Sequence, residues 1–291
     1  MHKETIASRC VDTSPPVCYN AFAMSHKSNR TYACKVPEVP KIEIIGVTGI
    51  PEVKHGDEIG VILTEAAKRQ NTVIQSNDIV VITQKIVSKS EGRIVDLRKI
   101  SPSNFATQLA QHSNRDPRLV ELILRESRAI IRMDLARGIF ITETQHGFIC
   151  ANAGIDTSNV PGDHMVSLLP KDPDKAAQRI RSQLHQRIPG GSIAVVISDT
   201  FGRPWREGHI NFAIGVAGMD SIHDYRGSED AYGTTLKTTQ IASADELAAA
   251  AELVMGKVRQ VPIAIVQGYK YVVGSNGAQT LLRHRSTDLF R

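Results

Sequence analysis

The chain contains a short apolar run that stops abruptly on polar residues. Residues 193–197 (Ile-Ala-Val-Val-Ile) are mostly β-branched, which indicates a strand buried on both faces. After one serine come Asp199 and Thr200, and a loop with glycine and proline then carries Arg203 and Arg206. Because the carboxyl ends of strands aim polar side chains into a crevice, we expect a site here that binds an anion beside a metal ion. A capping role for Asp199 alone is the alternative.

Other segments predict further strands and helices on both sides of this run. Apolar runs indicate strands, and apolar residues at helical spacing indicate helices. The strands are expected at residues 42–47, 78–83, 138–142, 147–151 and 261–267. The helices are expected at residues 57–68, 103–128, 172–187 and from 243 onward.

Composition limits the classes of function. The chain has 291 residues, of which 41% are hydrophobic and 22% charged, as in globular proteins of one large or two modest domains. Its longest apolar runs are much shorter than the roughly 18 residues needed to cross a bilayer, so we expect no membrane protein. The net charge of +5 is dispersed and aromatic residues make up 5%, which favours small phosphorylated ligands over nucleic acid.

The first residues predict an extension, and the cysteines predict the compartment in which the protein works. Residues 1–40 are rich in Ser, Thr, Pro and Lys without periodicity, which predicts a poorly ordered extension. No CxxC pair and no Cys/His cluster with zinc spacing occurs in the sequence. We therefore expect a reducing, cytoplasmic location.

Two other segments have the composition of ligand-binding loops. Residues 84–92 carry two lysines and two serines before a glycine, so Lys89 is a candidate phosphate ligand, with a solvated turn or the start of a helix as the alternative. Residues 151–162 are small and polar, and Asp156 and Asn159 offer oxygen ligands for Mg²⁺ or Mn²⁺ and a nucleotide. An Asx turn is the alternative there. The sequence has no GxxxxGK[ST] and no GxGxxG, so a nucleotide would be held without a P-loop.

Three long stretches of the sequence carry nearly continuous motifs. They are ITQKIVSKSEGRIV (82–95), HGFICANAGIDTSNVPG (146–162) and ISDTFGRPWREGHINFAIGVAGMDSIHDYRG (197–227). Together they resemble the coenzyme F420-0:γ-glutamyl ligase family, from about residue 44 to residue 267, and ELVMGK (252–257) adds support.

The resemblance implies an activity and a fold. Members of that family use GTP and Mg²⁺ or Mn²⁺ to add L-glutamate to the lactyl carboxylate of F420-0, and then extend the tail with γ-linked glutamates. The implied route converts the carboxylate to an acyl phosphate, which the amine of glutamate attacks. The implied fold is α+β, with mixed sheets, flanking helices and no P-loop, in an intertwined homodimer. Residues 41–291 would form the catalytic region, with two closely associated subdomains.

Matching positions imply roles for single residues. Asp156 and Asp199 match metal-binding carboxylates, and Thr200 matches a ligand of a second metal. Nucleotide contacts are implied for Ile50, Pro51, Glu52, Val53, Gln84, Lys85, Lys89, Asn159, Met255 and Gly256. Many archaeal members have Met-Gly-Gln with the glutamine at the second metal, but this chain has Lys257 there. A protonated lysine cannot ligate a divalent cation, which puts that metal position and a requirement for K⁺ in question.

Other interpretations remain open at this stage. Arg203 and Arg206 are candidates for binding the acidic substrate or the γ-phosphate, by charge and position, and surface arginines without a role are the alternative. The runner-up function is a related amide ligase acting on another phosphorylated acid, such as an F420 precursor derived from 3-phosphoglycerate. A phosphate- or nucleic-acid-binding protein without catalysis is favoured only by the pI near 9.0.

Overall fold

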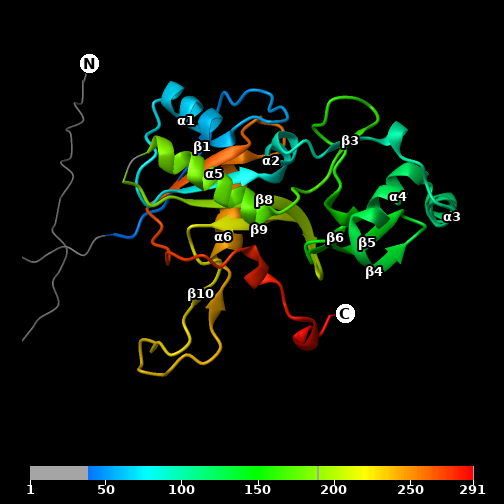
Figure 1. The fold of residues 1–291 in the computed structure, drawn as a ribbon. Helices are drawn as coiled ribbons and strands as arrows, with labels where there is room; N and C mark the ends of the chain where they lie inside the picture. The colour runs from blue at the N-terminus through cyan, green and yellow to red at the C-terminus, as the bar shows by residue number, and fades with distance from the viewer. Residues whose placement is uncertain (1–38, 189, 291) are drawn as a thin grey trace, which may run out of the picture. The chain divides into compact units, whose positions relative to one another are not determined.

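The computed structural model describes residues 39–188 and 190–290, which form a mixed α+β fold (Figure 1). Residues 1–38 of the extension expected over 1–40 lie outside the described residues. Within the described part of the chain, no helix is long and apolar enough to cross a membrane. The helices and mixed sheets of the described residues confirm the α+β class that we expected for the fold.

A five-stranded mixed sheet forms the centre of the fold, in the order β1-β12-β2-β8-β9. Its strands are β1 (Glu43–Val47), β2 (Ile79–Thr83), β8 (Ala194–Arg203), β9 (Arg206–Ala217) and β12 (Ile263–Gln267). Neighbouring strands β2 and β8 run parallel, from Ile79 beside Ala194 to Thr83 beside Ser198, and the other pairs of this sheet are antiparallel. The carboxyl ends of β2 and β8 therefore lie side by side.

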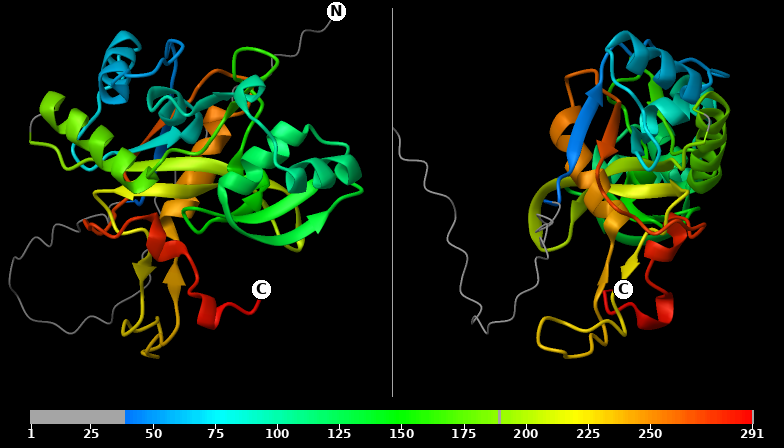
Figure 2. Two further views of the ribbon diagram at one scale, coloured as in Figure 1. Left: turned by 45° about the vertical axis from the view of Figure 1, so that its right-hand side comes forward. Right: turned by 90° about the vertical axis from the view of Figure 1, so that its left-hand side faces the viewer.

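Both faces of the central sheet are covered by helices, which explains its continuous apolar strands. Alternate residues such as Val80 and Val195 point to one face and pack with α1 (Ile59–Arg69) and α5 (Pro173–Arg187). Their sequence neighbours point to the other face and pack with the alanine-rich α6 (Ser243–Met255). Figure 2 shows the sheet between these two helical layers.

A second group of elements lies beside the central sheet (Figure 1). Helices α3 (Asn104–Ser113) and α4 (Pro117–Arg125) share an apolar cluster with Phe140 of a three-stranded antiparallel sheet. That sheet consists of β4 (Ser127–Asp134), β5 (Ile139–Thr144) and β6 (Ile149–Ala151). A short antiparallel pair, β3 (Ile94–Asp96) and β7 (Met165–Ser167), occurs in the connections to this group.

The remaining elements are short. The pair β10 (His223–Asp224) and β11 (Gln240–Ile241) begins a hairpin that extends away from the central sheet in Figures 1 and 2. Helix α2 (Gln84–Ser90) follows β2 directly. The 3₁₀ turns are η1 (Leu97–Lys99), η2 (Asn152–Gly154), η3 (Ala278–Leu281) and η4 (Arg285–Thr287).

Two local expectations were wrong. Strand β8 continues to Arg203 instead of ending near Asp199, because β9 pairs with it over its whole polar half. The helical pattern expected through residue 128 ends at Arg125, and the unpredicted strand β4 begins two residues later. Residues 84–90 form α2, which agrees with the helix start that was one of the alternatives for this segment. The strands and helices expected elsewhere are present with bounds shifted by a few residues.

Candidate functional site

The parallel pairing of β2 and β8 brings two distant candidate segments together. Thr83 ends β2 and pairs with Ser198, so α2 begins with Gln84 next to the point where β8 presents Asp199. Lys85 and Lys89 lie one turn apart on α2, which places both ammonium groups on the same face of the helix. The site is therefore positioned by the backbone pairing of the central sheet.

Asp199 lies in a half-buried and electrostatically crowded position on β8. Burial raises the pKa of its carboxyl group to about 7, a hydrogen bond from the Thr200 backbone opposes the rise, and the charge of Asp156 adds to it. Lys257 and Lys85 are near enough to act in the opposite direction on the same pKa. The structure thus brings Asp156 and Asp199 to one site, together with two ammonium groups.

Asp156 is held by the loop that follows β6. Asn152, Ala153 and Gly154 all have positive φ angles of 53°, 54° and 70°, an arrangement in which an Asn and an Ala rarely occur. Burial alone would raise the pKa of the Asp156 carboxyl group, but hydrogen bonds from Lys85 and Ser158 hold it below its ordinary value. The Lys85 Nζ atom lies 2.7 Å from Asp156 Oδ2.

The Lys85 ammonium also fixes the loop around Asp156. It donates to Ser158 Oγ at 2.6 Å and to the Ser158 carbonyl at 3.2 Å. The Ser158 backbone in turn donates to Asp156 Oδ1 at 2.7 Å. The Asx turn considered from sequence is therefore present, and it orients a carboxylate that faces the site.

The second lysine of α2 and its first residue are also partly engaged. Lys89 Nζ lies 2.6 Å from Glu52 Oε1, and the Lys89 side chain is only 11% exposed. Gln84 is fully buried and accepts a hydrogen bond from Ser88 Oγ at 2.8 Å. Its Nε2 atom is buried with no hydrogen-bond partner among residues 39–188 and 190–290, so one donor at the site is left for water or a ligand.

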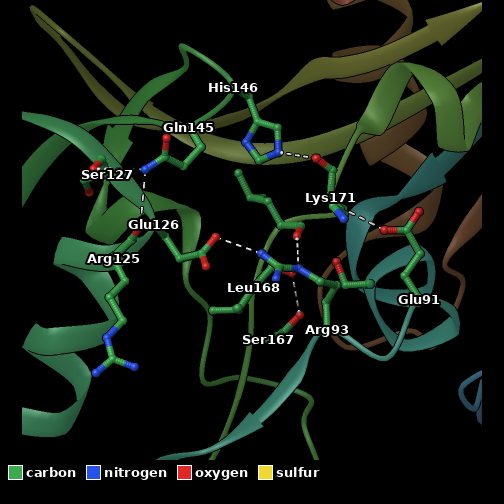
Figure 3. A network of polar contacts seen from close by, with 12 residues as sticks. Glu91, Arg93, Arg125, Glu126, Ser127, Gln145, His146, Ser167, Leu168 and Lys171 are labelled. Carbon is green, nitrogen blue, oxygen red and sulfur yellow. Dashed lines mark hydrogen bonds and ion pairs between the residues drawn. The ribbon is translucent and has the colours of Figure 1, made fainter. Parts of the chain in front are cut away.

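A polar network fixes the carboxyl end of α2 to the neighbouring elements (Figure 3). Glu91 pairs with Arg179 of α5 and accepts from the Lys171 backbone at 2.9 Å. Arg93 donates to the Leu169 carbonyl at 3.0 Å and to Glu126, next to β4, at 2.8 Å. Because the groups that meet here come from four segments, the network fixes the carboxyl end of α2 relative to α5 and to the start of β4.

Thr200 points away from Asp199, as adjacent strand residues do, and belongs to a separate hydrogen-bonded ring. The Thr200 hydroxyl donates to Asn211 Oδ1 at 2.7 Å, and Asn211 Nδ2 donates to Glu252 Oε2 at 2.9 Å. Lys257 Nζ donates to Thr200 Oγ1 and lies 3.6 Å from Glu252 Oε1, which closes the ring. We call these four residues, Thr200, Asn211, Glu252 and Lys257, the Thr200 ring.

The structure places Arg203 and Arg206 at the tip of the β8–β9 hairpin. Pro204 and Trp205 form the turn, with Trp205 at a φ of 60°. Arg203 lies four residues beyond Asp199 on an extended strand, or roughly 13 Å at about 3.3 Å per residue. Its guanidinium group donates to the Glu207 carbonyl at 2.7 Å, and Arg206 is exposed. The hairpin thus separates both arginines from Asp199 within one chain.

The other predicted nucleotide positions differ in accessibility. Among them Val53 and Met255 are buried, so their side chains are not open to a ligand. Pro51, Glu52 and Asn159 are exposed, while Ile50 and Gly256 are half-buried. Glu52 is the residue among these whose side chain connects directly to α2, through Lys89.

The donor set at the two carboxylates suits one hard divalent cation. Mg²⁺ is commonly bound through one or two carboxylates, with substrate phosphates and water completing the shell, and carboxylates also suit Mn²⁺. Asp156 and Asp199 offer that pair. Over residues 39–188 and 190–290, no three His, Cys, Asp or Glu side chains are placed to hold a metal ion by themselves. The residues therefore fit a cation that binds together with a phosphorylated ligand.

Sequence reasoning missed the partners of the predicted residues. Asn211 is only 3% exposed and directly precedes the apolar half of β9, and this buried polar residue was the available signal for the Thr200 ring. Glu252 lies on α6, whose alanines we attributed to close packing alone. Ser158 was part of the predicted loop, but its bond to Lys85 joins residues 73 positions apart and has no local signature.

Comparison with known proteins gives consistent matches over the described region. Residues 48–268 match the family described as F420-0:Gamma-glutamyl ligase. A coenzyme F420:L-glutamate ligase of Methanothermobacter thermautotrophicus is 47% identical over 253 residues, which cover 86% of this chain and 99% of that protein.

Two further relatives carry the same name. The protein of Methanocaldococcus jannaschii is 38% identical over 257 residues, which cover 88% of this chain and 99% of the relative. That of Methanopyrus kandleri is 39% identical over 258 residues, which cover 87% of this chain and 99% of the relative. The similarity therefore extends over nearly the full length of each relative.

Proposed function

Because the chain belongs to the F420-0:γ-glutamyl ligase family, we propose that it joins L-glutamate to the carboxylate of coenzyme F420-0. We propose further that GTP drives the reaction, that the cation is Mg²⁺ or Mn²⁺, and that additional glutamates are added through γ-linkages. The observation that supports this most is the meeting of Asp156 and Asp199 beside the lysines of α2. These segments carry the motifs of the resemblance, and they converge although they are far apart in the chain.

An activated intermediate is needed because a carboxylate is a poor acylating agent at neutral pH. In the proposed route, a carboxylate oxygen of F420-0 attacks the γ-phosphorus of GTP, and GDP leaves. The amine of glutamate then attacks the acyl carbon of the acyl phosphate, the carbon–oxygen bond to phosphate breaks, and an amide and inorganic phosphate are formed. The amine proton is released to solvent.

The chain's own residues bind and orient the reactants. Lys89 provides a positive charge for the phosphates, since its ammonium group contacts Glu52, another residue with an implied nucleotide contact. Lys85 holds the Asp156 carboxylate in one orientation through Ser158. A divalent cation bound by Asp156 and Asp199 would offset the charge of the β- and γ-phosphates during transfer.

The direct test is a product analysis. The purified chain is incubated with F420-0, L-glutamate, GTP and Mn²⁺, and products are weighed by mass spectrometry. We expect masses that increase by one or more glutamate residues, and no increase when GTP or the metal is omitted. Replacement of GTP by ATP tests the nucleotide preference. A folded, metal-loaded protein that produces no glutamylated product would contradict the proposal.

We also propose that the chain acts as a homodimer, as the family resemblance implies. Light scattering coupled to size-exclusion chromatography would then give twice the mass of one chain. A monomeric mass for protein that is fully active would contradict this part of the proposal.

A further inference from the structure

The Thr200 hydroxyl group is bound on both sides by members of the Thr200 ring. The Thr200 hydroxyl gives its hydrogen to Asn211 and accepts from the Lys257 ammonium. The Asn211 amide uses its oxygen for Thr200 and its nitrogen for Glu252. A metal ion that ligated Thr200 and Glu252 would have to occupy the space of the ammonium group, and a protonated lysine has no lone pair to offer it.

The ammonium group is held in the ring by charge and by the end of α6. Glu252 supplies a compensating carboxylate, 3.6 Å away. Lys257 follows the carboxyl end of α6 after Gly256, whose φ of 59° turns the chain there. A cation next to the carboxyl end of a helix is stabilised by the helix dipole and the free carbonyl groups. The location therefore favours a charged lysine.

The exposure of Lys257 indicates that its charge acts on ligands more than on stability. Its side chain is 59% exposed, and ion pairs of that exposure contribute little to folding. The ammonium group nevertheless contacts Thr200, the residue that follows Asp199 on β8. The ammonium is therefore a fixed positive charge at the edge of the proposed metal–nucleotide site.

We propose that the Lys257 ammonium is the resident cation on the Thr200 side of β8, so that the site binds one divalent cation, at Asp156 and Asp199, and no second one. This inference rests on the proposed function, because it concerns the cations of the same site. It reverses the role that the family resemblance implied for this position, from a metal ligand to a replacement for the metal.

The test counts bound metal instead of activity. The full chain is saturated with a non-hydrolysable GTP analogue, and bound Mn²⁺ is measured by equilibrium dialysis and by electron paramagnetic resonance. We expect one Mn²⁺ per wild-type chain and a second one in Lys257→Gln, which removes the charge and supplies an oxygen ligand. Lys257→Arg should retain one Mn²⁺, and Lys68→Gln, at an exposed lysine of α1, is the matched control.

The possible results separate this inference from the proposed function. Two Mn²⁺ ions in the wild-type chain, or a single ion in both the wild type and Lys257→Gln, would overturn the role of Lys257 while leaving the ligase proposal intact. A wild-type chain that binds no Mn²⁺ in the presence of the nucleotide analogue would contradict the metal site of the proposed function as well.

Discussion

Replacing Asp199 by asparagine should stabilise the metal-free protein at neutral pH while abolishing ligation. Burial raises the pKa of the Asp199 carboxyl group to about 7, from an ordinary value of 3.8. The folded protein thus retains a proton that the unfolded chain releases. The stability associated with this group is fully present below about pH 4 and is lost as the pH rises to about 7. Asparagine has nearly the same size, keeps an oxygen acceptor and carries no charge.

The size of the effect follows from the two pKa values. A difference of about three pH units corresponds to about 4 kcal/mol, which is an upper limit because the folded structure relaxes around the charge. We expect the free energy of unfolding of Asp199→Asn to rise relative to that of the wild type as the pH increases from 4 to 7. The difference should reach about 2–4 kcal/mol near pH 7 and stay constant above it. Its affinity for Mn²⁺ should fall, because an amide is a weaker ligand for a hard cation than a carboxylate.

Urea unfolding at several pH values in the presence of a chelator measures this directly. Asp156→Asn is the matched control, because hydrogen bonds hold the pKa of the Asp156 carboxyl group below its ordinary value despite burial. Its charged form stabilises the fold above pH 3.8, so this variant should be less stable than wild type at neutral pH. A stability difference for Asp199→Asn that is independent of pH, or a loss of stability at pH 8, would refute the reasoning.

Three further predictions concern the supporting residues. Lys89→Ala should weaken GTP binding by about tenfold or more in calorimetry, because a charged hydrogen bond to phosphate is worth about 1.5–3 kcal/mol. Glu126→Gln should lower the unfolding free energy by about 1–3 kcal/mol, because it leaves the half-buried Arg93 guanidinium without its anion. Gly154→Ala should lower both stability and Mn²⁺ affinity, because a Cβ would lie 2.8 Å from Leu169 at a φ of 70°.

Different results would contradict each of these three. Unchanged GTP affinity in Lys89→Ala would show that Lys89 forms an ion pair with Glu52 and does not contact the nucleotide. Unchanged urea midpoints for Glu126→Gln would show that the network of Figure 3 does not hold α2 in place. Normal Mn²⁺ affinity in a destabilised Gly154→Ala variant would mean that the strained turn does not position Asp156.

The sequence predicted the buried strands of the fold better than its polar ones. The apolar runs of β2, β8 and β12 are buried on both faces, and burial of this kind produces a continuous local pattern. Strand β4 and the outer half of β8 are only partly buried, and their strand conformation depends on pairing with β5 and β9. Pairing between separate segments has no local pattern, so these strands were missed.

The same reason limited the prediction of the site. Asp156 and Asp199 were predicted through the motifs around them, and the structure brings them together. The partners that determine their chemistry come from elsewhere in the chain, as Lys85 does for Asp156 across 71 positions. Arg203 illustrates the opposite case, because closeness in sequence along an extended strand still means separation in space.

The measurement that tests the account most directly is the fate of the carboxylate oxygens of F420-0. The coenzyme is labelled with ¹⁸O at that carboxylate and converted with L-glutamate, GTP and Mn²⁺, and the inorganic phosphate is analysed by mass spectrometry. An acyl phosphate carries one labelled oxygen between carbon and phosphorus, so we predict one ¹⁸O in phosphate for each amide formed. Glutamylated product accompanied by unlabelled phosphate would contradict the proposed reaction.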